Sequence, residues 1–256
     1  MIALKTAPQI AVMRENGALL ASVLQGLCNE ASPGQSTGEL DRMAEELIRK
    51  AGAEPAFKGY QGFPGTICSS INREVVHGIP SFDRRLDEGD ILSIDIGLHR
   101  NGMYMDMATT VPIGEVNAIA RRLIEVTEEA LWRGIEQVKI GRRVSDISHA
   151  IGAYVEAAGM YVVQQYVGHG IGKQLHEDPQ IPNYGSPGQG ARLREGMVFA
   201  IEPMVKLDPE LVEVLDDGWT VVTANGGLAA HFEHTVVITD TGVEILSLGG
   251  EKRRSG

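Results

Sequence analysis

Hydrophobic residues recur at helical spacing in four segments of the chain. Steps of three and four residues place each set on one side of a helix. We therefore expect four amphipathic helices, arranged as two consecutive pairs. Their predicted buried faces contain, in chain order, Ile10, Met13, Leu20, Leu24 and Leu27; Leu40, Met43, Ala44, Leu47, Ile48 and Ala51; Ile119, Leu123, Val126 and Ala130; and Ile147, Ile151, Tyr154, Val155 and Ala158.

The helix pairs are followed by segments that repeat at a fixed offset. Gly52 and Gly159, which close the second helix of each pair, lie 107 residues apart. Gly34 and Gly141, between the paired helices, have the same separation. The offset also aligns the apolar segment EGDILSIDIG with EGMVFAIEPM. A repeat of this length indicates that the chain consists of two related halves.

The repeat places Asp95 on Glu202, and both acids lie inside apolar strands. One such acid is unremarkable on a half-exposed sheet, but equivalent acids in both halves suggest a shared purpose. The halves are about residues 1–115 and 116–250. We expect them to form a single domain, residues 1–250, with pseudo-twofold symmetry.

The segment ILSIDIGL reads as a strand, and an Asn-Gly pair after it predicts a two-residue hairpin turn. Opposed residues in this hairpin have numbers that sum to 203. Asp95 then faces Ala108, and Asp106 faces Gly97. Because opposed residues share a face and side chains alternate, Asp95 and Asp106 lie diagonally on one face, about 7–8 Å apart. Both side chains can then reach one ion.

Two further acids, Glu202 and Glu233, lie in the apolar segments FAIEPM and HFEHT. Burial of an unpaired carboxylate costs several kcal/mol, and no arginine or lysine accompanies these acids. Divalent metal ions solve this problem, and His169 in YVGHGIGKQLHED adds a nitrogen ligand. The alternative is that each acid faces solvent on a half-exposed antiparallel sheet. A phosphate cradle is disfavoured because GHGIGK lacks the Walker A spacing.

Composition indicates which binding partners and which cellular compartment to expect. The net charge of −11 argues against nucleic acid, which requires a basic surface. Two cysteines, Cys28 and Cys68, are too few for a disulfide framework and fit a reducing compartment. The N-terminal residues contain no apolar run typical of a signal peptide or membrane span. We expect a cytoplasmic protein with a short basic tail, residues 251–256.

The segment YVGHGIGKQLHEDPQIPNY resembles the signature of type I methionine aminopeptidases. The resemblance continues through PAFKGYQGFPGTICSSINREVVHGIP, IDIG, YMDMATT, IEPM, DGWTV and HFEHT, and it covers nearly the whole chain. It implies a catalytic domain of the α+β class with the pita-bread fold. In that fold a curved antiparallel sheet carries two pairs of outer helices, and a dinuclear metal site lies at the pseudo-twofold axis.

The resemblance also implies the site residues. Two divalent ions, of Co, Mn, Fe or Zn, would be bridged by Asp106 and Glu233. The full set of implied metal ligands is Asp95, Asp106, His169, Glu202 and Glu233. A narrow apolar pocket for methionine would be lined by Tyr60, Phe63, Cys68 and Trp219, with Phe57 and Leu175 nearby.

We expect a metal-bound hydroxide to hydrolyse the peptide bond after an N-terminal methionine. Glu202 would accept a proton, His176 would steady the carbonyl oxygen, and His77 would bind the peptide nitrogen. The family link further implies nascent polypeptides as substrates, with a small second residue. A monomer is expected, and contact of the basic tail with the ribosome stays open. The remaining histidines receive no role: His99, His149, His231 and His234.

Two alternatives remain. Prolidases and Xaa-Pro aminopeptidases share the five ligands, but they usually carry an extra N-terminal domain. Here the first helix is expected within the first ten residues, which leaves no space for one. A protein that kept the fold and lost catalysis should lack ligands, whereas all five positions are filled.

Overall fold

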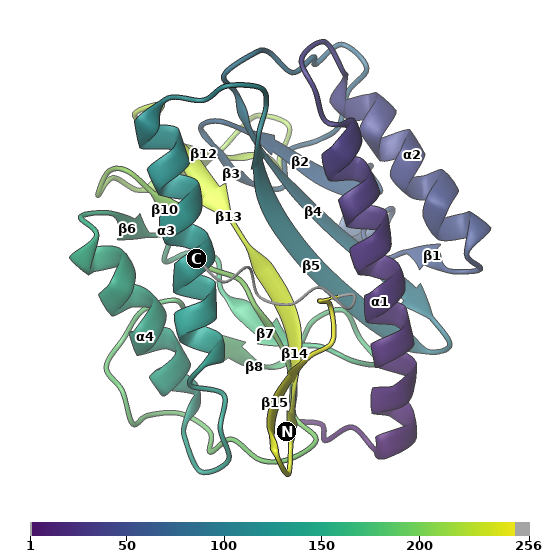
Figure 1. Ribbon diagram of the computed structural model, residues 1–256, viewed down its shortest axis with the longest axis vertical. Helices are drawn as coiled ribbons and strands as arrows, with labels where there is room; N and C mark the ends of the chain where they lie inside the picture. The colour runs from purple at the N-terminus through teal and green to yellow at the C-terminus, as the bar shows by residue number, and fades with distance from the viewer. Residues whose placement is uncertain (1, 249–256) are drawn as a thin grey trace.

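A computed structural model describes residues 2–248 of the chain. Its helices form two pairs: α1 (Ala7–Glu30) with α2 (Thr37–Lys50), and α3 (Ala118–Ile135) with α4 (Val144–Ala157). Figure 1 shows the pairs on either side of the long strands that cross the centre of the molecule. None of the helices in residues 2–248 has the length and apolar character needed to cross a membrane.

Antiparallel strands make three sheets. The largest has nine strands in the order β1-β4-β5-β14-β9-β7-β8, with β2 also paired to β4 and β15 to β14. Two three-stranded sheets have the orders β13-β10-β6 and β11-β12-β3. The strands are β1 (Glu54–Pro55), β2 (Ile67–Ile71), β3 (Glu74–Val76), β4 (Ile91–Arg100), β5 (Met103–Pro112), β6 (Tyr161–Val162), β7 (Gly168–Gly170), β8 (Glu177–Ile181), β9 (Val198–Ile201), β10 (Met204–Lys206), β11 (Val212–Val214), β12 (Val221–Thr223), β13 (Ala229–His231), β14 (Glu233–Thr239) and β15 (Gly242–Ile245).

The expected α+β class, with a curved antiparallel sheet and two outer helix pairs, is confirmed. The two halves have closely matched bounds, since α2 and α4 each contain 14 residues and begin 107 residues apart. Strands β4 and β9 begin at the same offset, at Ile91 and Val198. The extent of the domain, residues 1–250, stays a prediction, and the basic tail at 251–256 lies outside the described residues.

The central hairpin forms as its turn residues predict. Asn101 and Gly102 have φ angles of 52° and 74°, the left-handed conformations that a two-residue turn needs. The pairs Asp95↔Ala108 and Gly97↔Asp106 are both present, so the predicted register is confirmed.

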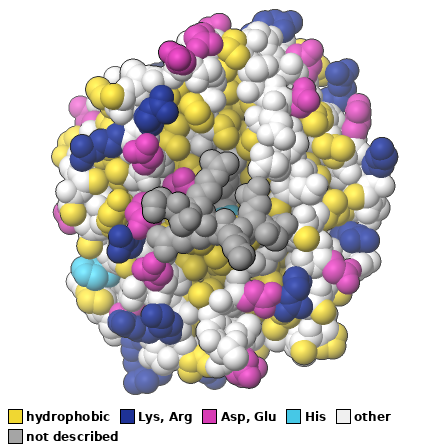
Figure 2. All heavy atoms as spheres, viewed as in Figure 1, with side chains coloured by type: hydrophobic (Ala, Val, Ile, Leu, Met, Phe, Trp, Pro, Cys, Tyr) yellow, Lys and Arg dark blue, Asp and Glu magenta, His cyan; other side chains and the backbone are white. Residues whose placement is uncertain are grey.

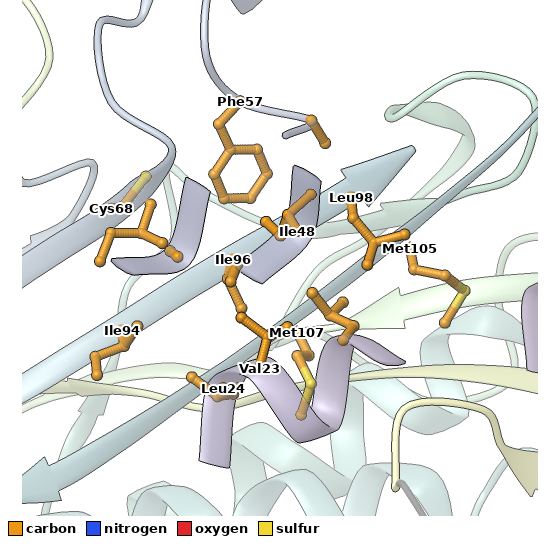
Figure 3. Close-up of a cluster of buried hydrophobic side chains, with 14 of the residues drawn as sticks. Val23, Leu24, Ile48, Phe57, Cys68, Ile94, Ile96, Leu98, Met105 and Met107 are labelled. Carbon is orange, nitrogen blue, oxygen red and sulfur yellow. The ribbon is translucent and has the colours of Figure 1, made fainter. Parts of the chain in front are cut away.

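Side chains alternate between the two faces of this hairpin, so one face is hydrophobic and buried and the other carries polar residues. Figure 3 shows Ile94, Ile96 and Leu98 of β4 close to Met105 and Met107 of β5, with α1 residues nearby. These side chains belong to the core beneath α1 and α2, and a second core lies beneath α3 and α4. The intervening residues, which include both aspartates, face away from the helices and toward the interior of the curved sheet.

One predicted core position is wrong. Ile119 is 60% exposed, whereas Ala120 beside it is buried. Ile119 is the second residue of α3, and the Asn117 side chain caps the helix by accepting hydrogen bonds from the backbone N–H groups of Ile119 and Ala120. The buried stripe of α3 runs through Ala120 and Leu123. A one-residue change of phase is about 100° on a helix, which turns Ile119 toward solvent.

Charge is spread over the described surface. Figure 2 shows acidic and basic side chains interspersed on the visible face. Individual ion pairs on this surface, such as Arg14 with Glu244, join elements far apart in the sequence. Side chains of both signs are therefore mixed on this face.

Helix α1 approaches the C-terminal segment so closely that only glycine fits at one position. A Cβ atom on Gly17 would lie 2.0 Å from the carbonyl oxygen of Leu246. On Gly26 of the same helix, the nearest atom would be Met43 Cε at 3.7 Å. We expect Gly17→Ala to lower the free energy of unfolding by about 1–3 kcal/mol through overpacking.

Gly26→Ala is the matched control, because it makes the same change in the same helix without a clash. It should raise the free energy of unfolding by about 0.5–1 kcal/mol, since alanine favours a helix interior. Urea-induced unfolding followed by circular dichroism measures both changes. Equal stability of Gly17→Ala and the unaltered protein would contradict the packing described for α1.

Candidate metal centre and pocket

A row of aligned residues crosses the large sheet. Strand pairing joins Cys68 to Asp95, Asp95 to Ala108, and Ala108 to Glu233. Because directly opposed residues share a face, these four side chains project to the same side of the sheet. Ala108 has the small side chain in the row, and it leaves room between the two acids that flank it.

The other predicted ligands continue this row or flank it. Glu202 follows the last residue of β9, and the register of β9 with β14 carries it beside Glu233. Asp106 lies two residues before Ala108 on β5, and therefore on the same face. His169 of β7 pairs with β9 two residues before Glu202. Five residues from five strands or strand ends therefore converge on one region.

This region is the floor of a pocket of about 210 Å³. Among the described residues that line it, none is lysine or arginine. Within this described lining, three buried carboxylate oxygens have no hydrogen-bond partner: Oδ1 of Asp95, Oδ1 of Asp106 and Oε1 of Glu233. Buried acceptors without donors are rare, and they are the ligands that hard divalent cations prefer. The oxygen atoms of these three carboxylates are therefore suited to bind a metal ion.

The geometry is compact. Asp106, His169 and Glu233 offer ligand atoms that all lie within 4.8 Å of one another. His169 Nε2 is 3.4 Å from Oε1 of Glu202. The other ring nitrogen of His169, Nδ1, lies 2.8 Å from the carbonyl oxygen of Gly170. Because a carbonyl only accepts, Nδ1 carries the proton and Nε2 presents a lone pair to the pocket.

The glycines beside His169 are required by close backbone contacts. A Cβ on Gly168 would lie 2.5 Å from the carbonyl oxygen of Ala200, and one on Gly170 would lie 2.1 Å from that of Asp178. Any side chain at either position would push β7 away from its neighbours. These two glycines therefore allow the backbone to pack tightly around His169.

The electrostatics of the cluster are unfavourable without a cation. Burial raises the pKa of Asp95 to about 7, although hydrogen bonds with Asp106 and Cys68 oppose the shift. Burial also raises the pKa values of Asp106, Glu202 and Glu233, and repulsion from neighbouring carboxylates adds to each shift. Burial lowers the pKa of His169 to about 3, so this imidazole is neutral at pH 7.

Two more predicted residues, His77 and His176, line the same pocket. His176 Nδ1 lies 2.8 Å from the hydroxyl oxygen of Tyr60. The rings of His169 and His176 are 4.4 Å apart. His77 has a left-handed backbone, with a φ of 60°, a strained conformation often found at functional sites. Burial, followed by the proximity of His176, lowers the pKa of His77 to about 4.

The apolar wall also contains every residue that the resemblance implied. Phe63 and Trp219 make an edge-to-face contact with ring centres 5.2 Å apart. The predicted wall residues that line the pocket are Phe57, Tyr60, Phe63, Cys68, Leu175 and Trp219.

Sequence reasoning missed some lining residues, of which the most notable is His231. This histidine ends β13 and is 1% exposed, and its Nε2 lies 3.9 Å from Oε2 of Glu202. Strand alternation could not have indicated it, because β13 ends at His231 and Glu233 begins a different strand, β14. The other missed lining residues are Gln61, Val76, Tyr166, Val167 and Met204.

A buried set of carboxylates and imidazoles in an otherwise apolar pocket is typical of metal-dependent hydrolases. The chain belongs to metallopeptidase family M24, whose model matches residues 11–240.

Similar proteins cover nearly the whole chain. A methionine aminopeptidase of Clostridium acetobutylicum is 52% identical over 97% of this chain and 99% of its own. Methionine aminopeptidase 1 of Bacillus subtilis is 53% identical over 96% and 99%.

Solved structures show the same likeness. The methionine aminopeptidase of Thermotoga maritima is 45% identical with a TM-score of 0.95, covering 96% of this chain and 99% of its own. A prolidase of Pyrococcus furiosus is 25% identical with a TM-score of 0.76, and it is covered over only 66% of its length.

The raised pKa of Asp95 predicts how pH affects the metal-free protein. Between about pH 4, near the pKa of an unfolded aspartate, and pH 7, the folded protein keeps a proton that the unfolded chain releases. The contribution of Asp95 to stability therefore falls as pH rises through this window. Asp95→Asn cannot titrate and serves as the reference.

After chelator treatment, urea unfolding of both proteins at pH 5, 6 and 7.5 gives the difference in unfolding free energy. We expect the unaltered protein to lose at least about 1 kcal/mol relative to Asp95→Asn across this range, the equivalent of one pKa unit. If the unfolding free energy of the unaltered protein, relative to that of Asp95→Asn, stays constant or rises with pH, the assignment of a raised pKa is refuted.

Proposed function

We propose that this protein releases the N-terminal methionine from peptides and nascent proteins whose second residue is small. The observation that carries the proposal is the row of carboxylates, with His169, on the floor of a pocket that has an aromatic wall. Family membership and relatives named as methionine aminopeptidases support the same activity.

We infer that the centre holds two divalent ions. Asp95, Asp106, Glu202 and Glu233 together carry −4 when ionised, which balances two such ions. We assign the bridging role to Asp106 and Glu233, whose ligand atoms lie with that of His169 within 4.8 Å of one another. An oxygen-rich set with one imidazole suits Mn, Fe or Co at least as well as Zn. Bound ions would supply a water of lowered pKa and polarise the scissile carbonyl.

The residues of the chain then have separate tasks. Glu202 lines the pocket with Oε1 3.4 Å from His169 Nε2, where its carboxylate can accept a proton from the attacking water. The Tyr60 hydroxyl beside His176 Nδ1 fixes the ring so that Nε2 can donate to the carbonyl oxygen as charge develops. His77 is neutral at pH 7 and can hydrogen-bond to the peptide nitrogen without adding charge.

The apolar wall explains the choice of methionine. Phe63, Trp219 and Tyr60 offer flat surfaces on which an unbranched thioether can pack, since sulfur makes favourable contacts with aromatic rings. Cys68 lies next to Asp95 in the row, which brings the wall directly against the metal centre. A methionine side chain in this pocket would therefore place the carbonyl of the same residue, where the peptide bond is cleaved, next to the metal centre.

Substrate choice separates this proposal from a proline-specific one. The purified protein is stripped with chelator, and single metals are then added back before incubation with Met-Ala-Ser, Met-Leu-Ser and Ala-Pro-Ser. We expect no release without metal, and release from Met-Ala-Ser about 10- to 100-fold faster than from Met-Leu-Ser, because a bulky second residue disturbs the fit. Cleavage confined to Ala-Pro-Ser would favour a prolidase-like activity.

His176 can be tested separately from the metal ligands. His176→Ala should lower kcat by about 10²–10³-fold through the loss of a donor to the carbonyl oxygen, with metal content unchanged. His149→Ala is the control, because that histidine is exposed and lies outside the pocket. Its ring nitrogen Nδ1 lies 3.2 Å from the carbonyl oxygen of Gly185. Turnover of the metal-replete His176→Ala variant equal to that of the control would remove His176 from the reaction.

A further inference from the structure

His231 lies in the pocket but takes no part in the chemistry described above. Its Nε2 is buried and has no hydrogen-bond partner among the described residues. A buried polar atom without a partner costs about 1–3 kcal/mol, so its retention in the pocket requires an explanation. The nearest acidic group is Glu202, whose Oε2 is 3.9 Å from Nε2.

The backbone of His231 is held firmly in place. The Thr110 hydroxyl donates to the carbonyl oxygen of His231 at 2.8 Å and accepts from its N–H at 2.9 Å. Since that hydroxyl has one proton, Ser93 must donate when its own hydroxyl approaches Thr110 to 2.8 Å. Ser93 and Thr110 are opposed on β4 and β5, the strands that carry Asp95 and Asp106. The same hairpin therefore positions two acids and this histidine.

Two imidazoles approach the Glu202 carboxylate, one at each oxygen. His169 Nε2 is 3.4 Å from Oε1, and His231 Nε2 is 3.9 Å from Oε2. They differ in what they can offer. The His169 proton is committed to the carbonyl of Gly170, so its Nε2 presents a lone pair. His231 Nε2 has no such constraint, and it can carry a proton toward the carboxylate.

We propose that His231 is a positioning residue for Glu202, to whose Oε2 its Nε2–H donates a hydrogen bond. A movement of about 1 Å brings these atoms to the usual distance of about 2.9 Å. The bond fixes the direction of the second Glu202 oxygen, while the first faces His169 and the metal centre. Groups that orient a ligand in this way commonly change metal affinity or activity 10- to 100-fold when they are removed.

A neutral donor suits this place. A neutral imidazole can donate through its N–H without adding charge. The ring therefore orients Glu202 without cancelling its charge, and the four carboxylates keep the −4 that two divalent ions require. The inference rests on the proposed function for its catalytic part, but its effect on metal binding can be measured without any substrate.

The test compares His231→Gln, which keeps an N–H donor, with His231→Leu, which keeps bulk and removes the donor. Mn²⁺ is titrated into each chelator-stripped protein by calorimetry. We expect His231→Leu to weaken Mn²⁺ binding at least 10-fold and His231→Gln to stay within about 3-fold of the unaltered protein. With Met-Ala-Ser, the leucine variant should lose kcat while KM changes less than about 2-fold.

Thr110→Val provides a second variant, since it leaves the ring intact and removes only the hydroxyl that holds the His231 backbone. It should weaken Mn²⁺ binding in the same direction, and it should add no further loss in the His231→Leu background. Thermal unfolding shows whether each variant is folded.

Two outcomes would overturn the inference. Unaltered Mn²⁺ affinity in His231→Leu would show that the carboxylate needs no donor there. Equal losses in His231→Gln and His231→Leu would make the imidazole a direct ligand or a packing element. Absence of methionine release by the unaltered protein would instead contradict the proposed function, while the Mn²⁺ titration would still decide the role of His231.

Discussion

Repulsion among four buried carboxylates is the constraint on which the rest of this structure depends. Asp95, Asp106, Glu202 and Glu233 meet in a pocket that offers no lysine or arginine among its described lining residues. Burial raises the pKa of each of these acids, and repulsion from neighbouring carboxylates adds to the shifts of Asp106, Glu202 and Glu233. Proton uptake or cation binding can resolve it, and divalent cations would do so at neutral pH through the carboxylate and imidazole ligands of the pocket.

The fold keeps the carboxylates together because backbone pairing, rather than side-chain contact, sets their positions. Asp95 and Glu233 share a row through Ala108, and a shift of one residue in either pairing would turn an acid toward the hydrophobic core. The helix pairs cover the opposite face of the sheet and bury its apolar residues. Hydrophobic burial therefore stabilises an arrangement that electrostatics alone would disperse.

Local rules allowed much of this to be predicted. The Asn-Gly turn determined the register of the hairpin, and that register placed Asp95 and Asp106 on one face. Ile119 was misplaced because periodicity alone cannot decide where a stripe begins in the first turn of a helix. His231 was missed for a different reason. Its approach to Glu202 depends on the packing of β13 against the hairpin, a contact between distant segments that no local pattern encodes.

Crystallography with anomalous scattering can show whether the carboxylate row holds two cations. Crystals of the protein grown with Mn²⁺, measured near the manganese absorption edge, would reveal each bound ion as a separate peak. The account predicts two peaks, about 3.5–4 Å apart, with Asp106 and Glu233 between them. The absence of peaks at this pocket, or Asp95 and Glu202 directed away from any common centre, would contradict it.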